Sequence, residues 1–200
     1  MQYDLNLLFF INGLAGHIGW LDAMVALFST YGPLLFGAYL LVLWFAGKTL
    51  EEKRENRKQA LYGVASLFLA LGINHVLGLL WFRSRPYVDH TVQRLVSVHS
   101  EASFPSNHAA GSMSIAASLW CGLARSGRLF LVLAVLMAVS RVYAGVHYPS
   151  DVLAGMAVGF LSSFLIHKNR RHLEKPVGVI LAVAEELERK LGYSKAVAHK

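Results

Sequence analysis

The segment SRVYAGVHYPSDVLAG, residues 140–155, joins two long apolar blocks of this chain. It carries Arg141, His147 and Asp151, and the last two stand four positions apart, which places them on one face wherever the backbone is close to helical. Pro149 suits the first turn of a helix, because its fixed φ matches and its missing N–H is not needed there. The segment therefore predicts a helix, a short polar connection and a second helix, with reactive side chains at the junction.

The rest of the chain repeats this pattern of apolar blocks separated by polar segments. Of its 200 residues, 55% are hydrophobic and 16% are charged, whereas a soluble domain has about 25% charged residues. The blocks are roughly as long as the 17–25 residues that cross a bilayer as a helix, so we predict an all-α, polytopic transmembrane bundle of about five to six spans. The expected spans are residues 20–46, 60–82, 107–124, 129–142 and 149–166, with the short apolar run 5–11 at the interface or re-entrant.

The polar segments between the blocks predict the connections. Segment 177–191 has helical periodicity and a charged end, which indicates an amphipathic helix at the membrane surface. The expected connections are an exposed loop at 47–59, a polar loop at 83–106, a tight basic turn at 125–128 and a basic segment at 168–175. The expected division is a membrane domain at 1–170, with its core at 60–166, and a cytoplasmic or interfacial tail at 171–200.

Lys and Arg concentrate in three of these connections, 47–59, 125–128 and 168–175. Threading the chain through the expected spans places all three on one side of the membrane. By the positive-inside rule that side is cytoplasmic. The polar residues of 83–108 and 140–151 then face outward.

The charge and cysteine content exclude several classes of function. The net charge is +7, but the charges gather between apolar blocks rather than along one face, as nucleic-acid binding would need. Anionic lipid head groups are the better counterpart. Cys121 is the only cysteine, so no intramolecular disulfide is expected. No metal-ligand spacing stands out, and no metal or cofactor is expected.

The residues of 140–155 suit attack on a phosphate. Asp151 can accept a proton from one ring nitrogen of His147 and leave the other nitrogen free as a nucleophile. A lone histidine at such a place is more often a packed or interfacial residue. Its spacing from Arg141 and Asp151 favours a functional role, since ionisable residues in membrane segments are commonly functional.

Two further polar segments, PSNH (105–108) and RP (85–86), border apolar blocks. The free N–H groups of a first helical turn and the Ser106 hydroxyl can bind an anion, and His108 is placed as a general acid. Taken alone, Ser106 is an ordinary helix cap. Arg85 presents a planar fork that matches phosphate oxygens, although an arginine at the end of a span commonly snorkels. In the loop that follows, His90, Arg94 and His99 are candidates for contact with a second phosphate.

These segments, in this order, resemble the type-2 phosphatidic-acid-phosphatase superfamily, membrane enzymes related in their core to vanadium haloperoxidases. The resemblance covers approximately residues 60–166. Within it, WFRSRPYVDHTV (81–92), ASFPSNHAAGS (102–112) and SRVYAGVHYPSDVLAG are most similar to the bacitracin-resistance branch of undecaprenyl-diphosphate phosphatases, and the similarity extends to GWLDAMVALFSTYG (19–32).

The resemblance implies a metal-independent, cofactor-free reaction through a phosphohistidine. It implies that His147 is the nucleophile, that Asp151 orients it, and that His108 serves first as general acid and then as the base that activates water. The phosphate ligands that it implies are Arg85, Ser106, Arg141 and the main-chain N–H groups near Asn107.

One position departs from the superfamily pattern. The first motif usually has a lysine seven residues before its arginine, and Gly78 stands there in this chain. Arg83 is the nearest candidate for the missing phosphate contact, but two positions along a helix end turn it well away from the direction of Arg85.

We therefore expect a phosphatase that acts on an isoprenoid lipid diphosphate in the bilayer. It would remove the terminal phosphate of undecaprenyl diphosphate on the extracytoplasmic side of a bacterial cytoplasmic membrane and return undecaprenyl phosphate to cell-wall synthesis. Three alternatives remain open. In the first, the substrate is another lipid phosphate, either phosphatidylglycerophosphate or phosphatidate. In the second, the enzyme transfers the phosphoryl group to another lipid instead of to water. In the third, the protein is not an enzyme but transports or binds an anionic lipid. The sequence leaves the oligomeric state open.

Overall fold

The computed structural model describes residues 2–98 and 102–191. Within them the chain is helical apart from turns and one isolated bridge between Ser84 and Ala102, so the all-α prediction is confirmed. The helices are α1 (Gln2–Asn12), α2 (Gly19–Phe45), α3 (Leu50–Leu80), α4 (Pro86–Asp89), α5 (Asn107–Gly122), α6 (Ala124–Tyr143), α7 (Pro149–Lys168) and α8 (Arg170–Lys190).

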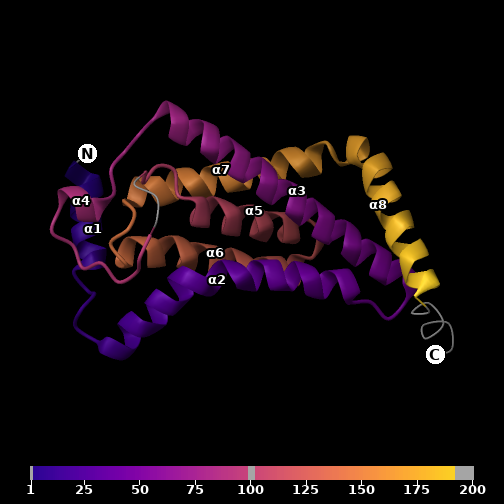
Figure 1. The fold of residues 1–200 in the computed structure, drawn as a ribbon, viewed down its shortest axis with the longest axis horizontal. Helices are drawn as coiled ribbons and strands as arrows, with labels where there is room; N and C mark the ends of the chain where they lie inside the picture. Colours follow the sequence, from indigo (N-terminus) through magenta and orange to yellow (C-terminus); the bar gives the residue numbers. More distant parts are fainter. Residues whose placement is uncertain (1, 99–101, 192–200) are drawn as a thin grey trace.

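Helices α2, α3, α6 and α7 are each long and apolar enough to cross a membrane, and Figure 1 shows them as the long rods of the bundle. Helix α5 has 16 residues and is buried at every position from Ala109 to Leu119. Its length is about 24 Å at 1.5 Å per residue, less than the roughly 30 Å of hydrocarbon in a bilayer. It is therefore the central helix of the bundle, covered by the longer ones.

Small residues let α5 and α7 approach closely. A Cβ atom at Gly155 would stand 2.5 Å from the carbonyl oxygen of Ser106, and one at Gly159 would stand 2.3 Å from that of Ala110. Close backbone contact through glycine, alanine and serine is a common way for helices to associate in lipid. This contact holds the start of α5, which carries His108, against the first turns of α7, which carry Asp151.

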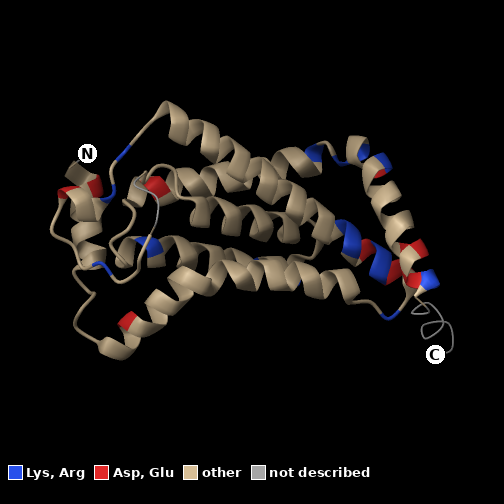
Figure 2. Ribbon diagram, viewed as in Figure 1, with Lys and Arg blue, Asp and Glu red and all other residues tan. Residues whose placement is uncertain are grey.

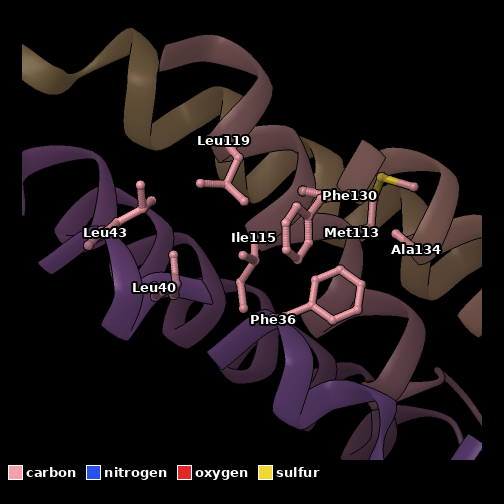
Figure 3. Close-up of a cluster of buried hydrophobic side chains, with 10 residues drawn as sticks. Phe36, Leu40, Leu43, Met113, Ile115, Leu119, Phe130 and Ala134 are labelled. Atoms are coloured by element: carbon pink, nitrogen blue, oxygen red, sulfur yellow. The ribbon is translucent and has the colours of Figure 1, made fainter. Parts of the chain in front are cut away.

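The largest apolar cluster lies where α2, α5 and α6 meet, as Figure 3 shows. Phe36 and Leu40 of α2 pack against Ile115 of α5 and Phe130 of α6, and the two phenyl rings meet edge to face with centroids 5.2 Å apart. Edge-to-face pairs add about 1 kcal/mol beyond the area that they bury. The cluster fixes α2 and α6 on either side of α5.

The two ends of the bundle differ. Helices α1 and α4 and the connections after α3 and α6 gather at one end, and α8 lies across the other (Figure 1). Most of the Lys, Arg, Asp and Glu residues of α3 and α8 lie at this second end (Figure 2). The predicted amphipathic helix is present as α8, which buries Val177 and Leu181 against Tyr62.

The expectation of an exposed loop at 47–59 is wrong. Helix α3 begins at Leu50, and the side chain of Thr49 caps it by accepting a hydrogen bond from the Glu52 amide at 3.1 Å. Within this helical segment Arg57 is buried and pairs with Glu188 of α8. Charged side chains that suggest a loop form ion pairs with α8, more than a hundred residues further along the chain. The local composition does not reveal these partners.

The tight basic turn at 125–128 and the separate basic segment at 168–175 are also wrong. Helix α6 begins at Ala124, and the connection shrinks to Leu123, whose amide bonds to the Leu119 carbonyl. Only Asn169 separates α7 from α8, so most of 168–175 is helical. A single residue, Leu123 or Asn169, therefore connects each of these pairs of helices.

Candidate active site

A cavity of about 640 Å³ opens at the end of the bundle opposite α8. Its walls come from α2, α3, α5 and α6 and from the connections after α3 and α6. The structure brings five of the expected site residues together around it, namely Arg85, Asn107, His108, Arg141 and His147. All three polar segments that the sequence singled out therefore meet at one cavity.

His147 lies between α6 and α7 and is buried, with one ring nitrogen directed to Arg85. Its Nε2 is 3.2 Å from Nη1 of Arg85. A guanidinium can only donate, so Nε2 accepts and the ring proton sits on Nδ1. Burial lowers the pKa of His147 to about 4, so the ring is neutral at pH 7. An imidazole that is unprotonated at Nε2 can act as a nucleophile once the phosphate takes over the hydrogen bond from Arg85.

The Nδ1 side of His147 meets a serine that the sequence interpretation missed. Ser103 Oγ is 3.4 Å from Nδ1 and donates a hydrogen bond to Oδ2 of Asp151, while the direct distance from Nδ1 to that oxygen is 3.7 Å. Asp151 therefore acts on the ring by its charge and through Ser103. Ser103 stands inside ASFPSNHAAGS, but no local feature distinguishes it from the other serines there.

Asp151 is fully buried in the first turn of α7, as its position after Pro149 predicts. Its Oδ2 accepts from the Tyr148 amide at 2.9 Å, and its Oδ1 accepts from Nη1 of Arg83 at 2.8 Å. A buried carboxylate needs such partners to remain charged. Asp151 is not among the residues that line the cavity, and its contacts to His147 and Ser103 connect it to the site.

Arg83 lies outside the cavity, on the far side of Asp151. Besides its bond to Asp151, it donates to Oδ2 of Asp4 at 2.6 Å and stacks over the ring of Tyr148, with 3.6 Å from guanidinium carbon to ring centroid. Asp4 comes from α1 and also accepts from Ser150. This geometry gives Arg83 the role of orienting the carboxylate, and Asp4 is a second residue that the sequence interpretation missed.

The two arginines of the cavity both donate hydrogen bonds to neutral oxygen atoms of the described residues. Nη1 of Arg85 donates to the Val146 carbonyl at 2.8 Å, and Nη1 of Arg141 donates to the hydroxyl and carbonyl oxygens of Ser29 at 2.8 and 2.9 Å. Nε of Arg141 is buried and has no hydrogen-bond partner among residues 2–98 and 102–191. Ser29 stands in the GWLDAMVALFSTYG segment, where only the tertiary structure reveals its partner.

His108 and Asn107 open α5 at the cavity wall. Ser106 caps the helix, since its side chain accepts from the Ala109 amide, and it is buried beneath the cavity rather than lining it. The first amides of a helix lack acceptors within the helix and favour an anion. His108 is half-buried and shares this wall, where it can deliver a proton to a group held by Arg141.

His90 and Arg94 lie outside the cavity. The ring of His90 packs edge-on between Phe9 and Tyr148, and the guanidinium of Arg94 stacks over Tyr87 at 4.2 Å while its Nε donates to the Val96 carbonyl. Both side chains support the wall that surrounds the site. His99, the third candidate in this loop, lies outside the described residues.

Comparison with known proteins identifies the family to which this chain belongs. The family model of the PAP2 superfamily matches residues 59–174. This chain belongs to the PAP2 superfamily. The resemblance drawn from the three polar segments is thereby confirmed, and the matched range contains all five expected site residues that line the cavity.

Relatives cover nearly the whole chain. The undecaprenyl-diphosphatase BcrC of Bacillus subtilis (strain 168) is 30% identical over 181 residues, which are 90% of this chain and 91% of that protein. The crystal structure of Aquifex aeolicus LpxE superposes with a TM-score of 0.68 at 24% identity, over 82% of this chain and 94% of that one. A PAP2-type phosphatidylglycerolphosphate phosphatase from Bacillus subtilis superposes with a TM-score of 0.58 at 25% identity, over 86% and 88%.

In this PAP2 superfamily member the cavity combines a neutral nucleophile, two guanidinium groups and a second imidazole. In residues 2–98 and 102–191, no three His, Cys, Asp or Glu side chains cluster as metal ligands would. The two guanidinium groups and the helix amides suit phosphoryl transfer in which they stabilise the charge on the equatorial oxygens.

Proposed function

We propose that this protein removes the terminal phosphate of undecaprenyl diphosphate and yields undecaprenyl phosphate. One observation carries the proposal: the unprotonated Nε2 of a neutral, buried His147 meets Arg85 at a cavity that also holds Arg141 and His108. A binding or transport protein would need the arginines but not the nucleophile. The similarity to the undecaprenyl-diphosphatase BcrC over 90% of the chain supports this substrate.

An apolar cavity beside the first one supports a lipid substrate. It has a volume of about 250 Å³ and lies between α2, α3 and α5, where Pro33, Leu67 and Leu71 line it. It shares Asn107 and His108 with the cavity of about 640 Å³ that contains His147, which we call the phosphate cavity. A molecule with a phosphate head and an isoprenoid tail would occupy both cavities at once.

The proposed reaction has two steps. In the first, Nε2 of His147 forms a bond to the terminal phosphorus while the bond from phosphorus to the bridging oxygen breaks, and that oxygen takes a proton from His108. In the second, His108 takes a proton from water, the water oxygen attacks the phosphorus, and the phosphorus–nitrogen bond breaks to release orthophosphate. Arg85 and Arg141 bind the equatorial oxygens, and Asp151 stabilises the charge that develops on His147.

The same proposal places the site on the extracytoplasmic side of a bacterial cytoplasmic membrane. The supporting observation is the distribution of charge along the bundle: basic residues crowd the end that carries α8 and the start of α3 (Figure 2). The positive-inside rule assigns such an end to the cytoplasm. The cavity lies at the other end.

Orthophosphate release by the purified protein in detergent with EDTA tests the proposal. Undecaprenyl diphosphate is compared with phosphatidate and phosphatidylglycerophosphate, with the His147→Ala variant as the blank. Preference for the diphosphate supports the proposed function. Equal or faster release from the glycerolipids would move the function to phospholipid metabolism, which the similarity to a phosphatidylglycerolphosphate phosphatase makes the second candidate.

Two further outcomes separate the remaining alternatives. Phosphate loss that requires an added lipid acceptor indicates phosphotransfer. Binding of the diphosphate without release above the His147→Ala blank indicates a binding or transport protein. Turnover near the normal rate in His147→Ala would contradict the assignment of the nucleophile.

A further inference from the structure

Helix α3 presents one continuous face to both cavities. Leu67 and Leu71 line the apolar cavity, and Asn74, His75 and Gly78 line the phosphate cavity one turn and two turns further on. These positions follow the spacing of three and four residues that keeps side chains on one side of a helix. The face therefore changes from apolar to polar between Leu71 and Asn74.

Asn74 is a polar residue without an established purpose in the reaction. It is 2% exposed, and its Nδ2 donates to Oδ1 of Asn107 at 3.0 Å, while its own Oδ1 is buried without a partner among the described residues. A buried polar atom without a partner costs about 1–3 kcal/mol. A ligand that supplied the missing hydrogen bond would recover this free energy.

The pair of amides can adapt to an anion. Asn107 is exposed, so its amide is free to turn. Turning the amides of Asn74 and Asn107 together by half a turn keeps their hydrogen bond and places an N–H of Asn74 where its unpaired oxygen lies. The imidazole of His75, on the next position and exposed, can donate a second hydrogen bond into the same part of the cavity.

The order of groups in the cavity matches the order of groups in a lipid diphosphate. The reactive end has His147 with Arg85 and Arg141, and the tail end has Leu67 and Leu71. A diphosphate places its lipid-side phosphate between the terminal phosphate and the tail. Asn74 and His75 lie at that intermediate level of α3, and Gly78 leaves room there, since a Cβ atom would meet only the Phe104 carbonyl, at 3.5 Å.

We propose that Asn74 and His75 form a subsite for the lipid-side phosphate and thereby select lipid diphosphates over lipid monophosphates. This inference rests on the proposed function and deepens it, because it names the part of the protein that recognises the second phosphate. Thr30 of α2 also lines this cavity but is not equivalent, since its hydroxyl already donates to the Ala26 carbonyl at 2.8 Å.

The test compares two substrates that differ only in the second phosphate, farnesyl diphosphate and farnesyl monophosphate. We measure kcat/KM for both with the wild type, Asn74→Ala, His75→Gln and the double variant. We expect each single variant to lose about tenfold on the diphosphate, as a hydrogen bond to a charged group predicts, and to change by less than about threefold on the monophosphate. The double variant should lose more on the diphosphate than either single variant.

Thr30→Val is the matched control, because it changes the same cavity wall without removing a donor to the substrate, and it should leave the ratio of the two kcat/KM values unchanged. His75→Gln keeps the test informative if Asn74→Ala folds poorly, since His75 is exposed. Equal losses on both substrates, or no loss on either, would overturn the subsite while the proposed function stands. A wild type that releases no phosphate from either farnesyl diphosphate or undecaprenyl diphosphate would overturn both.

Discussion

Two buried arginines, Arg57 and Arg141, show how the two ends of this bundle differ. Arg57, at the α8 end, is 1% exposed, pairs with Glu188 and donates to the Trp44 carbonyl at 2.9 Å. Arg141, at the cavity, is 3% exposed, is held by two oxygens of Ser29 and has no carboxylate partner among the described residues.

The difference lies in where the neutralising charge comes from. A buried cation is costly unless an anion or several hydrogen bonds compensate it. At the α8 end the protein supplies the carboxylate, so Arg57 stabilises the fold. At the cavity Arg141 meets only neutral oxygens among the described residues, so its charge is available to a phosphate. Burial alone does not distinguish a structural arginine from a functional one, whereas the charge of its partners does.

The largest expected effect comes from Arg141→Met. Loss of a phosphate donor should lower kcat/KM for undecaprenyl diphosphate by about 100-fold, or roughly 3 kcal/mol of transition-state stabilisation. The thermal unfolding temperature in detergent should stay the same or rise, because an uncompensated buried charge is removed. Turnover within threefold of the wild type would contradict the role given to Arg141.

Glu188→Gln tests the other arginine and should have the opposite pattern. It leaves Arg57 buried without its carboxylate and should lower the free energy of unfolding by about 2 kcal/mol. The value of kcat/KM per folded molecule should not change, because the cavity lies at the other end. Denaturant titration and phosphate release on the same preparation measure both quantities, and Glu186→Gln, at an exposed pair with Arg189, is the matched control. A loss of activity without a loss of stability would break the comparison.

The pKa of His147 sets an expected dependence on pH. Since burial lowers this pKa from 6.5 to about 4, the unfolded chain binds a proton between pH 6.5 and 4 that the folded chain does not. Stability is therefore complete above pH 6.5 and is lost as the pH falls toward 4, by up to about 1.4 kcal/mol per pH unit. Thermal unfolding across this range should show a shallower slope in His147→Gln than in the wild type. Identical slopes would show that the histidine is already protonated near pH 6.5.

The smallest expected effect comes from Asp4→Asn, on α1. Arg83 would lose one of its two carboxylates and hold Asp151 less firmly, so kcat should fall about fivefold, or roughly 1 kcal/mol. In an Arg83→Met background the same change should have little further effect, because coupled residues are not additive. Gln2→Ala, at an exposed position of the same helix, is the control. Equal effects of Asp4→Asn in both backgrounds would show that Asp4 does not act through Arg83.

The sequence alone predicted the bounds of some helices more accurately than those of others. The expected spans at 20–46, 107–124 and 149–166 differ from α2, α5 and α7 by one or two residues, because long apolar blocks and a proline or serine at the start are local signals. The spans at 60–82 and 129–142 begin too late, because the first turns of α3 and α6 are charged. Their charges are compatible with helix only because α3 meets α8 and α6 follows α5 with a single-residue break.

By itself the sequence determined that this chain is a helical membrane protein of the PAP2 superfamily, and it named Arg85, Arg141, His108 and His147 of the cavity but not His75. Those features depend on apolar length, on capping residues and on the spacing of neighbours, all of which are local. Only the tertiary structure decided the partners: Ser29 for Arg141, Ser103 between His147 and Asp151, and Arg83 with Asp4 behind the carboxylate. These contacts join residues 44 to 112 positions apart, and hydrogen bonds over such separations follow from how helices pack rather than from any pattern along the chain.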